Sequence, residues 1–578
     1  MKPTEEDREN AKERKREYCN SVTEKPEADG SRRWLRIIRP GNSIHAPQSM
    51  ECFLSCCSQA VAVSSSLFRD YSIELGLPAT ILPSTIPSWL IWSAGLLAGT
   101  GAISFLFRRW IRHTSREQLF KFRARLERYK LVDRRLVRAE LMGDPVVLEA
   151  MGAHAAAHGM AIDQVREKVE RYIDEIVPFF NVLSYYKLGY NLSRLLINLL
   201  YKVSVEYQDR EALDAIPRDD VVLYVMNHRS NADYVVVAYV LARVVSISYA
   251  VGEWARTWPL EYIFKSFGSY FIRRRFREPL YHSVLERYVQ LITRNGVTQG
   301  IFPEGGLTRD GALRPAKVGL IDYMVRTLDD PKFTRDIWLV PVGINYDRVL
   351  EDRSLIRERI VGIRRPRLAG QLAGVLTYLF WNTVRLFTGR LRRYGRAAVN
   401  FGSPISVRQW LAGQPGNPLR LPRYERLAQV QRLADHAMER IGAVIPVTPV
   451  PLAAAALLSF GASVIPFARL LDRMDDLRDE LGELNAKVVR SELPVAEVWS
   501  RAWRTLEMRQ LVIRQGKDLV ILPRQRPLLE YYANSIRHLL PPTTYEIFSP
   551  ARESDPTLPR LATREEVEIA RDQRQGNR

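Results

Sequence analysis

The chain has 578 residues, of which 46% are hydrophobic and 26% are charged, so most of it should fold into globular domains. Lysine and arginine outnumber aspartate and glutamate by 85 to 65, and the net charge of +20 favours a partner that carries phosphate, such as nucleic acid, anionic lipid or a phosphorylated substrate. All four cysteines lie in the first tenth of the chain, which argues against a disulfide framework and for a reducing compartment.

The N-terminal part of the chain predicts a leader followed by an anchor. Residues 1–80 read as a variable, poorly ordered leader, and residues 81–112 as a candidate membrane anchor. Ser88–Phe107 is uncharged and about long enough to cross a bilayer as a helix, although a buried helix of a helical domain is the alternative. Arginines follow at once from Arg108, which would place the C-terminal side in the cytoplasm.

The middle of the chain changes from helical to alternating patterns. Residues 113–202 show apolar spacings of three and four, typical of a helical domain. Residues 203–407 predict an α/β domain with a central mixed sheet covered by helices. Its expected strands are Val221–Met226, Val244–Val251, Val297–Phe302 and Ile337–Ile344. Leu372–Arg393 could either lie on a membrane surface or cover the sheet.

Residues 408–550 return to helical periodicity and predict a helical C-terminal region, followed by a charged tail at 551–578. Within this region Leu452–Phe467 is apolar but only about 16 residues long, so a buried core helix is favoured over a membrane span. We find no internal repeat. The basic residues are dispersed, and no helix-turn-helix, zinc-finger or aromatic RNA-binding signature occurs, so nucleic acid is not expected as a partner.

A polar stretch follows the first predicted strand of the α/β domain. VMNHRSNADYVVV places His228, Arg229 and Asp233 where that strand ends, which is where ligands bind in open α/β sheets. Ser230–Asp233 also fits a capping box at the start of a helix. Residues five apart diverge on a continuous helix, so His228 and Asp233 can meet only if the histidine precedes the helix and the chain bends.

Two further stretches carry charge at strand ends. In GSYFIRRRFREPLY, Arg273, Arg274 and Arg275 emerge together, and forked guanidinium groups suit a phosphate, although a solvated basic turn is the alternative. In IFPEGGLTRDG, Glu304 could hold a hydroxyl or pair with an arginine, and Gly305 permits close approach of a ligand or a positive φ. A glycine turn with a solvated acid is the alternative there.

Additional positive charge near this turn comes from Arg309 and Lys317. A fourth stretch, WLVPVGINYDRV, is a strand interrupted by Pro341, which predicts an edge strand or a bulge lining the site.

The order of these motifs, HxxxxD, FIRR, FPEGG and VPVGxNYDR, resembles the glycerophospholipid acyltransferase family, and most closely the branch that acylates glycerol 3-phosphate. YIDEIVPFFN at Tyr172–Asn181 and GSPIS at Gly402–Ser406 are also similar to that branch, and the resemblance covers roughly residues 165–470. One departure is Leu307-Thr308, where many members carry Arg-Ser, so an expected phosphate contact is missing and the acceptor is less certain.

The resemblance implies a role for each matching residue. His228 would be the general base for the acceptor hydroxyl, and Asp233 would orient the imidazole. The expected binding residues for the acceptor phosphate, the acceptor pocket and the acyl donor are Arg229, Arg273, Arg274, Arg275, Glu304, Gly305, Arg309, Lys317 and Pro341. Backbone N–H groups after His228 could stabilise the oxyanion.

The expected reaction moves an acyl group from acyl-CoA or acyl carrier protein to the sn-1 hydroxyl of glycerol 3-phosphate at a cytoplasmic or inner membrane. A thioester is already activated, so no metal or cofactor is expected beyond that acyl co-substrate. Dihydroxyacetone phosphate and lysophosphatidate stay open as acceptors. A protein of another class, a non-catalytic basic protein that binds membrane phospholipid, is the remaining alternative.

Overall fold

The computed structural model describes residues 133–179, 190–241, 247–256, 260–274, 276–361 and 393–540, together with Trp381 and Arg385. The leader, the candidate anchor at 81–112, the charged tail and most of Leu372–Arg393 lie outside these residues. No helix within the described part of the chain is both long and apolar enough to cross a membrane.

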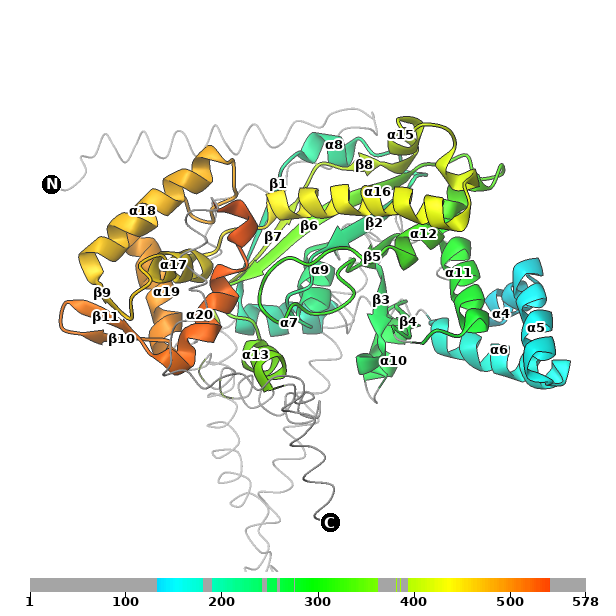
Figure 1. Ribbon diagram of the computed structural model, residues 1–578, viewed down its shortest axis with the longest axis horizontal. Coiled ribbons are helices and arrows are strands. Elements are labelled where there is room, and N and C mark those ends of the chain that lie inside the picture. Colours follow the sequence, from blue (N-terminus) through cyan, green and yellow to red (C-terminus); the bar gives the residue numbers. More distant parts are fainter. Residues whose placement is uncertain are drawn as a thin grey trace, which may run out of the picture. The chain divides into compact units, whose positions relative to one another are not determined.

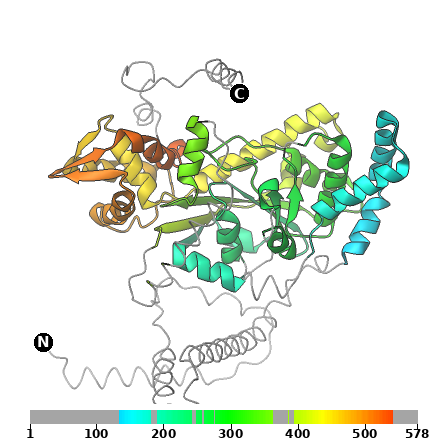
Figure 2. The same ribbon diagram turned by 90° about the horizontal axis from the view of Figure 1, so that it is seen from below.

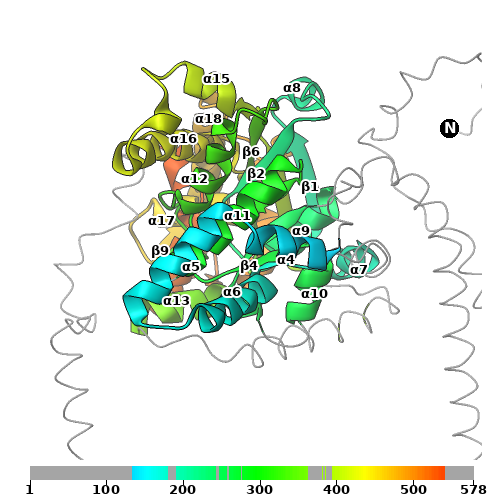
Figure 3. The same cartoon turned by 90° about the vertical axis from the view of Figure 1, so that its right-hand side faces the viewer.

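Three helices open the described chain, α4 (Arg134–Met142), α5 (Pro145–His158) and α6 (Ile162–Ile176). α5 illustrates how the sequence sets the ends of a helix. The Asp144 carboxylate accepts the N–H groups of the first turn, a proline opens the helix, and Gly159 ends it at φ 61°. These helices pack on α11 (Pro279–Arg294), as Figure 3 shows.

The centre of the fold is a mixed sheet of eight strands in the order β1-β7-β6-β2-β5-β3-β4, with β8 paired to β6. The strands are β1 (Lys202–Tyr207), β2 (Val221–Met226), β3 (Ser248–Gly252), β4 (Tyr270–Ile272), β5 (Gln299–Ile301), β6 (Ile337–Tyr346), β7 (Arg396–Phe401) and β8 (Ile405–Ser406). All neighbouring pairs are parallel except β6–β7 and β6–β8. β2, β4, β5 and β6 therefore end at one edge of the sheet.

Side chains of the central strands divide between two cores because successive residues of a strand point to opposite faces. On β2, Leu223 and Val225 join the core that contains α11 and α16 (Arg423–Val444). Tyr224 and Met226 join the core that contains α7 (Tyr190–Leu200) and α9 (Asp233–Leu241). Figure 1 shows α16 along one face of the sheet and α7 and α9 on the other.

The remaining helices within and after the sheet are α8 (Arg210–Asp214), α10 (Leu260–Ser266), α12 (Gly319–Val325), α13 (Asp352–Val361), α15 (Val407–Ala412), α17 (Pro449–Leu458), α18 (Phe467–Glu483), α19 (Val495–Met508) and α20 (Arg526–Ala533). All ten residues of α17 are buried, and α17 contacts α18, α19 and α20. Figure 2 shows this C-terminal group (orange) and the helices α4–α6 (cyan) at opposite ends of the sheet.

The structure confirms a central mixed sheet covered by helices. The predicted buried helix at Leu452–Phe467 is present in part: α17 ends at Leu458, and Val464–Pro466 forms β9. β9 joins β10 (Val512–Gln515) and β11 (Asp518–Ile521) in a small antiparallel sheet that the helical periodicity did not predict.

The prediction that Pro341 marks an edge strand is wrong, because β6 lies between β2 and β7 in the sheet interior. β6 pairs with β8 up to Leu339 and with β7 from Val342 onward. The carbonyl of Pro341 accepts the N–H of Gly402 at 2.8 Å, between these two pairings. A proline is tolerated here because its missing N–H falls where the strand changes partner.

Candidate active site

The predicted histidine and aspartate are in contact. His228 follows the end of β2, and Asp233 is the first residue of α9. His228 Nδ1 lies 2.9 Å from Asp233 Oδ2, and the two side chains are 1% and 0% exposed. The chain bends between them, as the five-residue spacing required.

Asp233 is held by several donors besides the imidazole. Its Oδ2 accepts the backbone N–H groups of Arg229 at 2.8 Å and Ser230 at 3.0 Å. Its Oδ1 accepts the hydroxyl of Tyr346, from the end of β6, at 2.6 Å. Burial and the nearby Asp233 charge hold the pKa of Tyr346 well above its usual value, so the phenol stays protonated and donates. The carboxylate is thereby fixed in one orientation.

Aromatic rings fix the plane of the imidazole. Phe302 stacks on His228 at a centroid distance of 4.0 Å, and Tyr234 meets it edge-on at 5.5 Å. A carboxylate on Nδ1 favours the tautomer with the proton on that nitrogen. Nε2 then carries the lone pair, which is what a general base requires.

Glu304 lies directly beside the pair, in the turn after β5. Its Oε1 accepts the backbone N–H of His228 at 2.7 Å. Burial raises the pKa of Glu304 to about 8, although that N–H and the charges of Arg229 and Arg314 counteract part of the shift. Gly305 follows at φ 68°, a conformation that suits glycine. Glu304 therefore exists largely in its neutral form near pH 7.

The expected oxyanion donors after His228 are already engaged. The N–H groups of Arg229 and Ser230 donate to Asp233, that of Asn231 donates to Glu351, and that of Ala232 donates to Ser230 Oγ. The prediction that this turn stabilises the oxyanion is therefore wrong. The same bonds show that only part of the predicted capping box forms, with Asp233 capping back to Ser230 N.

Arg273 does not have the contacts expected of a phosphate ligand. Its guanidinium forks onto Glu175 of α6, with Nε 2.7 Å from Oε1 and Nη2 2.5 Å from Oε2. The rings of Tyr172, Phe276 and Tyr281 surround it at 4.7–5.6 Å. This pair joins the helices α4–α6 to the end of β4, so the assignment of Arg273 to the acceptor phosphate is not supported.

Arg274 and Lys317 approach the Gly305-Gly306 turn. A Cβ atom on Gly306 would lie 3.5 Å from Arg274 Nη1, and one on Gly252 would lie 2.9 Å from Arg274 Nε. A Cβ atom on Gly305 would lie 2.7 Å from Cδ of Lys317. Neither cation forms an ion pair with another described residue. Arg275 lies outside the described residues.

The other predicted binding residues differ in their contacts. Arg229 lies in the catalytic turn and is 2% exposed; its Nη1 donates to the carbonyl of Gly311, its guanidinium lies 5.3 Å from the ring of Tyr531, and its Nε and Nη2 have no hydrogen-bond partner among the described residues. Arg309 pairs with Glu358 at 2.8 Å. Pro341 is buried in the sheet opposite Val225 rather than at the edge. Leu307, the departure from the family pattern, packs into the apolar core.

Three residues of this site escaped the sequence reasoning: Glu175, Tyr346 and Glu351. Tyr346 is the tyrosine of NYDR in the fourth motif, so the motif itself was a signal for it. Glu175 lies in the stretch similar to the acyltransferase branch, but nothing in the local sequence indicates that it pairs with Arg273. Within the described part of the chain, no cluster of three or more histidine, cysteine, aspartate or glutamate side chains could hold a metal ion.

An acyltransferase family model matches residues 205–345, and the model of the glycerol-3-phosphate acyltransferase C-terminal region matches residues 380–544. The glycerol-3-phosphate acyltransferases of Aeromonas hydrophila and Actinobacillus succinogenes are 30% and 28% identical to it, each over 71% of this chain and 50% of the relative. The chain spans about half the length of these curated relatives.

Among solved structures, the 1-acyl-sn-glycerophosphate acyltransferase of Thermotoga maritima is 18% identical, with a TM-score of 0.25, covering 44% of this chain and 80% of that one.

The mixed sheet, the helix that begins at the aspartate of HxxxxD and the family match at residues 205–345 define the class, an acyltransferase α/β domain. The match at residues 380–544 and the named relatives make the similarity more specific, because all of them are described as glycerol-3-phosphate acyltransferases. Over these residues the chain is similar to glycerol-3-phosphate acyltransferases, which confirms the resemblance found in its motifs.

Proposed function

We propose that this protein transfers a fatty acyl group from a thioester donor, acyl-CoA or acyl carrier protein, to the sn-1 hydroxyl of glycerol 3-phosphate. The observation that carries the proposal is the buried His228–Asp233 pair beside Glu304 and a glycine turn approached by two cations. The product would be 1-acylglycerol 3-phosphate, that is, lysophosphatidate.

In this reaction Nε2 of His228 takes the proton of the acceptor hydroxyl as the oxygen attacks the thioester carbonyl. The tetrahedral intermediate collapses with cleavage of the C–S bond, and the imidazolium returns the proton to the leaving thiolate. Asp233 stabilises the imidazolium and does not itself take the proton. Neutral Glu304 offers a hydroxyl donor to the acceptor, because its pKa of about 8 keeps it protonated at neutral pH.

The acceptor phosphate is assigned to Arg274 and Lys317. Both lie against the double glycine, whose missing Cβ atoms let the two side chains approach the turn closely. Neither has a carboxylate partner among the described residues, unlike Arg273 and Arg309, so their charge is available to an anion. Two such cations could also replace the arginine that many family members carry in place of Leu307.

The same proposal places the catalytic domain on the cytoplasmic side of the membrane, where the lipid product would enter the bilayer. Its support is the uncharged Ser88–Phe107 stretch followed by arginines. The basic composition would also favour contact with anionic phospholipid.

The test uses membranes that contain the full chain and a labelled acyl donor, supplied as acyl-CoA and as acyl carrier protein in separate assays. Each is offered glycerol 3-phosphate, dihydroxyacetone phosphate or lysophosphatidate, with His228→Ala membranes as the control. We expect labelled lysophosphatidate from glycerol 3-phosphate with the wild-type chain alone. Transfer only to another acceptor would overturn the substrate assignment, and equal turnover by His228→Ala would overturn the enzymatic role.

A further inference from the structure

Glu351 connects the catalytic turn to the C-terminal region. It precedes α13 and lies in the interval 346–379, which neither family model covers. Its Oε2 accepts the hydroxyl of Ser230 at 2.7 Å, and its Oε1 accepts the backbone N–H of Asn231 at 3.2 Å. Both donors belong to the six-residue turn from His228 to Asp233.

The two bonds restrain the middle of that turn. Asp233 itself accepts the N–H groups at its start, and Ser230 Oγ accepts the N–H of Ala232 at 3.1 Å. Glu351 thus supplies the acceptors for the part of the turn that Asp233 does not reach. Without it, the hydroxyl of Ser230 and the N–H of Asn231 would lose their acceptors.

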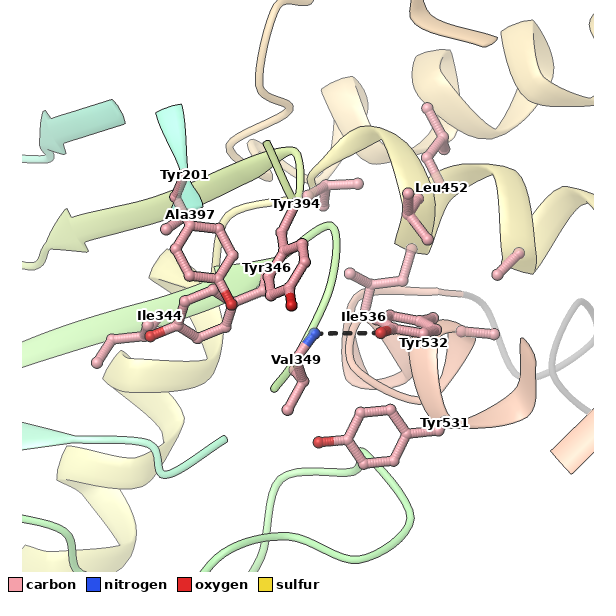
Figure 4. Close-up of a cluster of buried hydrophobic side chains, with 14 of the residues drawn as sticks. Tyr201, Ile344, Tyr346, Val349, Tyr394, Ala397, Leu452, Tyr531, Tyr532 and Ile536 are labelled. Atoms are coloured by element: carbon pink, nitrogen blue, oxygen red, sulfur yellow. Dashed lines mark hydrogen bonds between the residues drawn. The ribbon is translucent and has the colours of Figure 1, made fainter. Parts of the chain in front are cut away.

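Glu351 is itself fixed from the other side. The next residue, Asp352, is bound by both terminal nitrogens of Arg509, with Nη2–Oδ1 at 2.8 Å, and by the hydroxyl of Tyr532. All three side chains are buried. Tyr532 also accepts the N–H of Val349 at 3.1 Å, which Figure 4 shows together with the neighbouring ring of Tyr531.

We propose that Glu351 is a positioning residue, through which the C-terminal region holds the His228–Asp233 turn in the geometry needed for proton transfer. This inference rests on the proposed function. It assigns to the C-terminal region a part in catalysis without any contact with substrate: Arg509 and Tyr532 fix Asp352, the adjacent Glu351 fixes the turn, and the turn fixes the imidazole.

Burial of its carboxyl group and the nearby Asp233 charge raise the pKa of Glu351 to about 7, while the hydrogen bond from Ser230 counteracts part of the shift. Glutamine at this position loses one acceptor oxygen but also removes a charge that is costly to bury, and because these two effects oppose each other the melting temperature should change little. Glu351→Gln consequently separates a positioning role from a role in stability alone.

The experiment compares Glu351→Gln, Ser230→Ala and the double variant with wild type in the full chain, measuring kcat and the KM of glycerol 3-phosphate and of acyl-CoA. We expect kcat to fall about 10- to 100-fold in each single variant, since small misplacements of a catalytic group have effects of this size. Both KM values should stay within about threefold. The double variant should be little worse than either single one, because both remove the same contact.

Asp220→Asn is the matched control. The Asp220 carboxylate also accepts one backbone N–H, from Asp336, and one side-chain N–H, from Trp338, each at 2.9 Å. It precedes β2 at the end opposite His228, roughly 20 Å away at about 3.3 Å per strand residue. Its substitution should leave kcat unchanged.

The outcomes are distinguishable. If Glu351→Gln keeps wild-type kcat while His228→Ala is inactive, the inference fails and the proposed function stands. If Glu351→Gln changes only KM, or if Asp220→Asn loses as much kcat, the positioning role is likewise excluded. If His228→Ala remains active, the proposed function fails and the inference fails with it.

Discussion

Replacing Asp233 by asparagine tests the catalytic pair most directly, because the side chain keeps its shape and loses its charge. An imidazolium and a carboxylate 2.9 Å apart attract by roughly 6 kcal/mol at an effective dielectric constant of about 20. The amide oxygen of asparagine retains part of this as a dipole. A loss of about 4–5 kcal/mol in the transition state corresponds to a fall in kcat of about 10³- to 10⁴-fold.

The measurement is the initial rate of labelled acyl transfer to glycerol 3-phosphate at saturating substrates, with melting temperature recorded in parallel. Tyr346→Phe is the matched control, since it removes one donor to Asp233 at Oδ1 and leaves the contact with His228 intact. We expect it to lower kcat by about 10- to 100-fold, which is the range for one hydrogen bond to a charged group. A kcat for Asp233→Asn within tenfold of wild type would refute the reasoning.

Three other predictions follow from the described contacts. Arg274→Ala should raise the KM for glycerol 3-phosphate about 10- to 100-fold at unchanged melting temperature. Arg273→Ala breaks a fork onto a buried glutamate, so it should mainly lower the melting temperature. The reverse pattern would contradict both assignments. Gly311→Ala should destabilise the fold by about 2 kcal/mol or more in chemical denaturation, because at φ 86° its Cβ would lie 1.8 Å from a carbonyl oxygen of α20. An unchanged midpoint of the denaturation curve would exclude that contact. The pKa of Glu304 in the folded protein, about 8, exceeds its ordinary value of 4.5, so the folded state binds the extra proton and stability should fall as pH rises from about 4.5 to 8. Melting curves recorded across that range should lack this pH dependence in Glu304→Gln. Identical pH dependence in the variant and the wild type would contradict the raised pKa.

Local pattern was sufficient for the central strands of the fold. Val221–Met226 is a continuous apolar run with both faces buried, and it was predicted with its observed bounds. Neither β1 nor β7 was predicted: Lys202 and Glu206 interrupt the apolar pattern of β1, and β7 is a short run in which small residues follow Arg396. β1 is an edge strand, where fewer side chains must be apolar, whereas Ala397–Phe401 of β7 are all buried.

Contacts of the site were likewise predictable between residues close in the sequence, and not between distant ones. The contact of His228 with Asp233 was predictable because a helix cap builds it from neighbouring residues. The neutralisation of Arg273 by Glu175 joins residues 98 apart, and the contact of Glu351 with Ser230 joins residues 121 apart. Nothing in the local sequence names such partners, since they are brought together only by the order of the strands and the packing of the helices.

The apolar helix α17 and the close approach of Gly311 to α20 have a consequence for how such proteins diverge. A Cβ atom on Gly311 would meet the backbone of Tyr531 and not its ring, so the loop that contains this glycine and the path of α20 must match each other, whichever side chain follows. We therefore expect chimaeras that join the sheet of one relative to the C-terminal region of another to lose activity unless the Gly311 loop and α20 come from the same parent.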